Sequence, residues 1–110
     1  MFKTNEYYFE KIIKNIDFIS EHMEGISKEQ LEDDEILSDS MAFRLVQISE
    51  IAKNFSEEYK NAHPEIPWTY INALRNRLVH DYGNVDLSVV YDTLTKDLPE
   101  LKEVLERIRT

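Results

Sequence analysis

The sequence contains no cysteine, only two glycines and only three prolines among its 110 residues. Without cysteine the chain can form neither a disulfide framework nor a thiolate metal site. An all-β fold needs many tight turns, and glycine and proline are the residues that such turns use most. Their scarcity disfavours an all-β fold, so we expect helices.

Long apolar runs are also absent. No stretch approaches the roughly 20 apolar residues that a membrane-spanning helix requires, and the first residues lack the apolar run and the small-residue cleavage site of a signal peptide. We therefore expect no membrane association and a cytoplasmic location. The length suits a single domain, residues 1–110, with one modest core.

Positive charge is scarce as well, since 22 acidic side chains outnumber 13 lysines and arginines and leave a net charge of -9. Phosphate contacts usually require a basic face, so this balance argues against a nucleic-acid partner. The charges are unevenly distributed, however. Residues 21–35 hold seven acids and one lysine, whereas residues 67–80 hold two arginines and no acid. If any surface meets phosphate, the second segment is the candidate.

Apolar residues recur at three- and four-residue steps, the pattern of amphipathic helices. One stripe spans residues 9–23 and should end near Gly25, after which Ser27 and Gln30 form a capping box that opens a short helix. A long stripe from residue 41 to residue 59 predicts one helix that stops before Pro64.

Two further helices are expected in the second half of the chain. Pro67 suits the first turn of one of them, and Asp86 can cap the last. Within that last helix Pro99 should cause a kink or a restart, with Asp97 as a fresh cap. Short connections between long helices favour antiparallel neighbours, so we predict an all-α, up-and-down bundle of four or five helices.

The helix that follows Pro67 breaks the amphipathic rule. Its apolar face contains Trp68, Ile71, Leu74, Leu78 and Tyr82. Arg75 falls inside this face, where a guanidinium is costly unless an anionic group meets it. Arg77 points to the opposite, solvated side. Arg75 is therefore the candidate functional residue.

His80 follows Arg75 by five residues, about 140° around an ideal helix. The two side chains can share a target if the helix loosens near His80, or if two copies of the chain combine their groups across a two-fold axis. Asn76 lies one turn before His80 and could orient its imidazole. The chain's histidines lack metal-ligand spacing, so we expect no metal site.

Residues 75–82, Arg-Asn-Arg-Leu-Val-His-Asp-Tyr, resemble the signature of the HEPN family, and the tyrosine two positions after the histidine resembles its HepT branch. The flanking segments 64–68 and 97–100 are similar to that branch, as is the order of the predicted helices. The resemblance covers almost the whole chain.

This resemblance implies an HEPN-like bundle that acts as an endoribonuclease toxin of a type VII-like toxin–antitoxin pair. It implies that Arg75 and His80 are the catalytic pair and that Asn76 is the supporting polar residue. Tyr82 matches the tyrosine that an MntA-like nucleotidyltransferase antitoxin modifies with AMP. HEPN domains commonly form homodimers whose two motifs line one cleft, and a higher oligomer with the antitoxin is conceivable. Asp81 departs from the family, where glycine is frequent, and its carboxylate would repel phosphate.

The residue types suit RNA cleavage without a metal or another cofactor, because RNA carries its own nucleophile, the 2′-hydroxyl. Histidine can move a proton near neutral pH, and arginine can stabilise phosphate charge. Two alternatives stay open at this point. One is a catalytically silent HEPN domain that binds a nucleotide or a nucleotidyltransferase partner. The other is a plain helical-bundle dimer in which Arg75 merely pairs with an acid such as Glu50 or Glu58.

Overall fold

The computed structural model describes residues 4–109, and within them all regular structure is helical, as predicted. The elements in chain order are α1 (Asn5–Met23), α2 (Lys28–Asp33), α3 (Glu35–Ala52), α4 (Glu57–Ala62), α5 (Trp68–Asp81), the 3-10 turn η1 (Tyr82–Asn84), α6 (Leu87–Asp92), the π turn η2 (Thr93–Asp97) and α7 (Leu98–Arg109).

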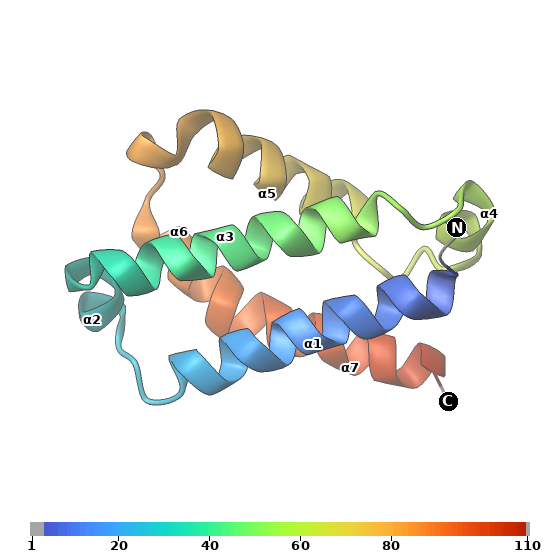
Figure 1. The fold of residues 1–110 in the computed structure, drawn as a ribbon, viewed down its shortest axis with the longest axis horizontal. Coiled ribbons are helices and arrows are strands. Elements are labelled where there is room, and N and C mark those ends of the chain that lie inside the picture. Colours follow the sequence, from blue (N-terminus) through green and yellow to red (C-terminus); the bar gives the residue numbers. More distant parts are fainter. Residues whose placement is uncertain (1–3, 110) are drawn as a thin grey trace.

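The long helices form an up-and-down bundle, which confirms the predicted architecture. In Figure 1 the green α3 lies between α1 and α5, and α6, η2 and α7 pass behind this layer as one rod. Successive long elements run in opposite directions. Their apolar stripes meet in one core, whose most deeply buried side chains include Ile16, Ile19, Leu31, Met41, Leu45, Ile48, Val90, Leu94 and Leu105.

The predicted signals at the first helix boundaries are confirmed. Gly25, just after α1, has a φ of 74°, a left-handed conformation that glycine adopts without a steric cost. The Ser27 side chain accepts from the Gln30 N–H, and the Gln30 side chain accepts from the Ser27 N–H, so the capping box is complete. Asp34 then caps α3 through the N–H of Leu37.

The prediction of one helix from residue 41 to residue 59 is wrong. α3 ends at Ala52, and α4 starts after Ser56, whose hydroxyl accepts from the Tyr59 N–H. Phe55 lies between the two helices and is buried against Tyr59 and Trp68. Phe55 and Tyr59 pack on the core although neither belongs to α3, so the apolar spacing continues across the break. The spacing alone therefore cannot show where the helix ends.

The last helix is also not restarted at Asp97, contrary to the prediction. Helical backbone runs on from α6 through η2 into α7, and the Leu98 N–H donates to the carbonyl of Thr93, five residues earlier. Pro99 therefore sits directly after a π turn, a wide turn that can accommodate its ring and its missing donor. The Asp97 carboxylate does not cap a helix; it accepts a hydrogen bond of 2.7 Å from the Tyr70 hydroxyl.

The core predicts a sharp contrast between two isoleucines. Ile16 is fully buried, whereas Ile36 is 82% exposed. Ile16→Ala should lower the free energy of unfolding by about 2–5 kcal/mol, because it removes buried methyl groups and leaves a cavity. Ile36→Ala should change it by less than about 0.5 kcal/mol. Urea denaturation followed by circular dichroism measures both, and equal losses would contradict this packing.

Candidate active site

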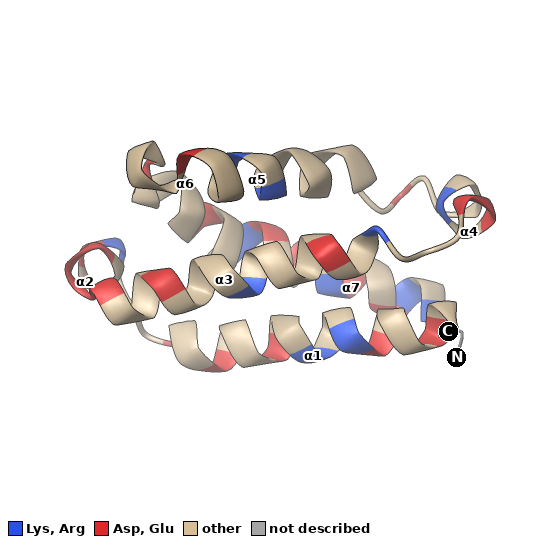
Figure 2. Ribbon diagram, turned by 45° about the horizontal axis from the view of Figure 1, so that its top comes forward, with Lys and Arg blue, Asp and Glu red and all other residues tan. Residues whose placement is uncertain are grey.

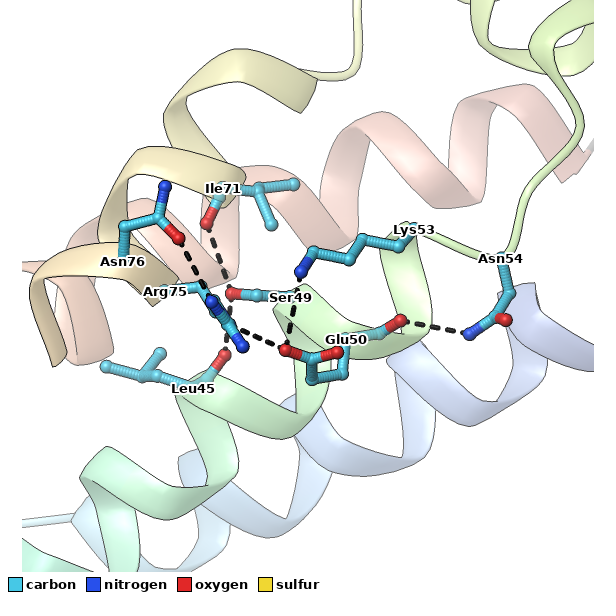
Figure 3. Close-up of polar contacts among 8 residues, drawn as sticks. All are labelled: Leu45, Ser49, Glu50, Lys53, Asn54, Ile71, Arg75 and Asn76. Atoms are coloured by element: carbon cyan, nitrogen blue, oxygen red, sulfur yellow. Dashed lines mark hydrogen bonds and ion pairs between the residues drawn. The ribbon is translucent and has the colours of Figure 1, made fainter. Parts of the chain in front are cut away.

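The candidate site lies along the contact between α3 and α5. The hydroxyl of Ser49, which is buried, lies 2.9 Å from the carbonyl oxygen of Leu45 and 3.1 Å from that of Ile71, so its one hydrogen is shared between the two acceptors (Figure 3). A small side chain lets the two helices approach closely, and the bond to Ile71 fixes α5 one turn before Arg75.

Arg75 is the cation on this contact, and it forms the ion pair with an internal acid that the plain helical-bundle alternative expected. Its Nε donates to Glu50 Oε1 at 2.6 Å, so of the two acids considered the structure selects Glu50 (Figure 3). One Nη1 hydrogen is donated to Asn76 Oδ1 at 3.1 Å. A guanidinium has five N–H donors. Within residues 4–109 two of them have acceptors, and the side chain remains 25% exposed.

Glu50 is ionised in this environment. The hydrogen bond from Arg75 lowers the pKa of the Glu50 carboxyl below its ordinary value of 4.5, against a smaller opposing effect of burial. Lys53, 3.5 Å from the same oxygen, adds to the lowering. At neutral pH the ion pair is therefore intact, and the Arg75 guanidinium is held at the edge of α3.

His80 lies in the last turn of α5 and is exposed. The α-helix gives way to a 3-10 turn at Tyr82, near His80 and ahead of Gly83, but the backbone from Arg75 to His80 is helical, so this loosening does not turn the two side chains toward each other. Arg75 faces α3, and helical geometry directs His80 about 140° away from it. Asn76 contacts Arg75; in the part of the chain that the structure describes, no hydrogen bond joins Asn76 to His80.

Tyr82 opens the 3-10 turn that follows α5. Its hydroxyl donates to Asp39 Oδ1 of α3 at 2.7 Å, and its ring contributes to a small cleft together with Phe43 and Leu78. Burial, followed by the hydrogen bond to Asp39, raises the pKa of the Tyr82 hydroxyl. The neighbouring Asp81 carboxylate accepts from the Asn84 side chain at 2.8 Å, within the same turn.

Two acids of α3 thus bind one residue of α5 and one of the turn after it, Glu50 with Arg75 and Asp39 with Tyr82, in an antiparallel register. The sequence did not reveal Asp39, because nothing in its spacing sets it apart from the other surface acids. Ser49 carries a weak signal, since it falls four residues after Leu45 on the apolar side of α3.

Charge along α5 differs from charge on its neighbours. In Figure 2 α5 carries blue in its middle and red only near its end, whereas α1 and α3 carry both colours along their length. Across residues 4–109 no group of three His, Asp or Glu side chains is arranged to hold a metal ion. None of the helices described is long and apolar enough to cross a membrane.

Comparisons with known proteins identify relatives of this chain along almost its whole length. A family model described as "HepT-like: Ribonuclease HepT-like" matches residues 12–108. A protein of Thermococcus cleftensis named "Probable ribonuclease HepT" is 33% identical over 109 residues, covering 99% of both chains. A candidate RNase of Caldanaerobacter subterraneus subsp. tengcongensis is 32% identical over 106 residues, covering 96% of this chain and 95% of that protein. No solved structure matches significantly.

The Arg75–Glu50 pair predicts a change in a measurable pKa. Removing the guanidinium by Arg75→Ala should raise the pKa of Glu50 toward 4.5, because the hydrogen bond that lowers it is lost. The stabilisation from this pair should be present above pH 4.5 and disappear as the pH falls through the lowered pKa. Carboxyl ¹³C shifts measured against pH report this titration. Arg77→Ala, which removes an exposed arginine of the same helix, should leave it unchanged.

Proposed function

Since this chain belongs to the HepT-like ribonuclease family, we propose that it is a metal-independent endoribonuclease whose catalytic groups are Arg75 and His80. The observation that carries the proposal is the state of Arg75. A guanidinium is held in place on α5 by Glu50 and Asn76, yet it retains N–H donors and partial exposure with which to meet a phosphate.

The proposed reaction needs only these groups and the RNA. The 2′-oxygen attacks the adjacent phosphorus, the bond from phosphorus to the 5′-oxygen breaks, and the products are a 2′,3′-cyclic phosphate and a 5′-hydroxyl. One histidine takes the 2′-hydroxyl proton, and another proton is delivered to the leaving 5′-oxygen. Arg75 donates to the non-bridging oxygens and stabilises the charge that develops on them.

Two copies of the chain are needed for this chemistry. Because α5 is regular from Arg75 to His80, the two side chains of one copy point in different directions. A two-fold axis beside α5 brings the Arg75 of one copy toward the His80 of the other and supplies two histidines, one as base and one as acid. Val79, which is 46% exposed between them, offers an apolar contact for such a dimer.

The toxin–antitoxin role rests on Tyr82. We place the AMP that a nucleotidyltransferase antitoxin adds on the Tyr82 hydroxyl, which lies at the surface of the α3–α5 contact beside Asp39. Tyr82 opens the 3-10 turn directly after α5, so the modified hydroxyl lies at the end of the helix that carries Arg75. An added phosphate and adenosine would reach toward Arg75, neutralise it and obstruct the cleft.

A second candidate function is supported by Glu50. The 2.6 Å ion pair already gives Arg75 an internal anion, the contact expected for a plain helical bundle, and an arginine neutralised in this way also suits a catalytically silent domain that only binds a nucleotide or a nucleotidyltransferase partner. Net charge of -9 and the carboxylate of Asp81 point the same way. The two functions differ in one measurable property, cleavage of RNA by the purified chain.

The endoribonuclease proposal predicts that Arg75→Ala and His80→Ala each lower the cleavage rate of single-stranded RNA by about 10²–10⁴-fold, because each removes a group that acts in the transition state. Arg77→Ala, an exposed arginine on the same helix, is the matched control and should retain activity. Cleavage should persist in EDTA and leave cyclic phosphate ends, detectable by mass spectrometry of the fragments.

RNA that stays intact after incubation with the wild-type protein would contradict the endoribonuclease proposal and favour the catalytically silent domain. Equal activity of wild type and His80→Ala would remove the assignment of the histidine. Circular dichroism of each variant separates loss of catalysis from loss of folding. Growth arrest on expression, relieved by the same two substitutions, tests the toxin role.

Modification of Tyr82 has its own prediction. Co-expression with the cognate nucleotidyltransferase should raise the intact mass by about 329 Da, the mass that one AMP adds, or by a multiple of it. Tyr82→Phe should abolish the increase. Tyr70→Phe is a close control, because the Tyr70 hydroxyl also donates to a carboxylate at 2.7 Å and Tyr70 is the more exposed of the two residues. A Tyr82→Phe chain that still gains this mass would contradict the assignment.

A further inference from the structure

A groove of about 780 Å³ runs between α1 and α3, on the side of α3 away from α5. Three cations line it, two lysines from α1 and one arginine from α3: Lys11, Lys14 and Arg44. One acid lines it, Glu50, and that carboxylate is already bound by Arg75 and Lys53. The groove is therefore positive in a chain whose net charge is -9.

These three cations differ from most others in the molecule. Lys53, Lys60, Lys96, Lys102 and Arg109 all form ion pairs with acids. Among residues 4–109, by contrast, no acid lies within ion-pair distance of Lys11, Lys14 or Arg44.

Arg44 is instead held by uncharged groups. Its Nη1 donates to Asn15 Oδ1 at 3.1 Å, and its guanidinium lies 3.7 Å from the centre of the Phe18 ring. Asn15 is itself buried, and its side-chain amide donates to the Lys11 carbonyl oxygen. The side chain is thus positioned in the groove without its charge being neutralised.

Two of the four acids of α1 are directed away from the groove. Glu10 pairs with Arg109 and Asp17 pairs with Lys102, both of which belong to α7. These two carboxylates therefore face α7, whereas Lys11 and Lys14 line the groove with α3. A polyanion approaching the groove meets the lysines first.

Exposed aromatic rings accompany the cations. Phe43 is 59% exposed and Tyr7 is 37% exposed, and both line the groove. A positive groove with aromatic rings at its surface is the usual arrangement for single-stranded nucleic acid, since phosphates follow the charge and bases stack on the rings. An apolar protein segment would not use three unneutralised cations.

The groove also leads to the candidate catalytic groups. Glu50 lines it and binds Arg75, and Phe43 lines both the groove and the small cleft that contains Tyr82. We propose that this groove binds the single-stranded RNA that flanks the phosphate held by Arg75, with Lys11, Lys14 and Arg44 on phosphates and Phe43 under a base. This inference rests on the proposed function and adds to it the surface along which the RNA substrate would bind.

Binding of a 12-nucleotide 2′-O-methyl RNA, which has no attacking hydroxyl, tests the groove separately from cleavage. Fluorescence anisotropy of the full chain should show that Lys11→Gln/Lys14→Gln weakens binding roughly tenfold and lowers the slope of log affinity against log salt by about 1.4, two phosphate contacts on a single strand. Lys28→Gln/Lys96→Gln, with the same change of net charge outside the groove, should behave as wild type.

Phe43→Ala should also weaken binding about tenfold, through the loss of a stacking platform. Ile36→Ala removes an exposed apolar side chain of the same helix outside the groove and is the control. The positions changed in these variants are all exposed: Lys11, Lys14, Ile36 and Phe43. The variants should therefore fold, and circular dichroism verifies this.

Each outcome decides the proposal. Unchanged affinity of the Lys11→Gln/Lys14→Gln variant, or no binding by the wild type, would overturn it. A dimer that becomes monomeric with the same substitutions, seen by light scattering, would also overturn it, because the groove would then face a second copy. Cleavage of a dinucleotide, which is too short to enter the groove, reports on Arg75 and His80 alone, so failure of the proposed function is recognised separately.

Discussion

The hydroxyl of Ser49 donates to the carbonyl oxygen of Ile71 across the contact between α3 and α5, and this buried bond sets how closely the two helices pack. On either side of it the Glu50–Arg75 and Asp39–Tyr82 contacts follow the same antiparallel register. A shift of α5 by one turn would separate both pairs. The positions of Arg75 and Tyr82 relative to α3 therefore depend on this register, while the apolar core supplies most of the stability.

An acidic protein that acts on RNA must keep its negative charge away from the phosphates. Here the charges are sorted by helix face. Glu10 and Asp17 of α1 pair with α7, whereas the lysines of α1 and the arginine of α3 line the groove. On α5 the carboxylates begin only at Asp81, which is bound within its own turn. The net charge is therefore a poor guide to the local charge of each face, because it is a sum over the whole surface and a ligand binds to one face only.

The sequence predicted the fold well, because apolar periodicity reports directly which side of a helix is buried. The capping box at Ser27 and the break at Gly25 were also readable, since their local chemistry does not need the rest of the protein. The errors arose where tertiary packing replaced local structure. Phe55 is buried although it lies in the connection between two helices, so its spacing was the same as that of a helical residue. A π turn precedes Pro99, where the sequence predicted a new helix cap.

The candidate site divides in the same way. The sequence alone identified Arg75 as an arginine on an apolar face and, through the resemblance of residues 75–82, the histidine and tyrosine that accompany it. Both follow from the order of residues along one helix. Which acid meets Arg75, that Asp39 binds Tyr82, and that two helices assemble a positive groove depend on residues far apart in the chain. Only the packing of α1 and α5 against α3 decides them, because a contact between helices has no signature in the spacing of either helix alone.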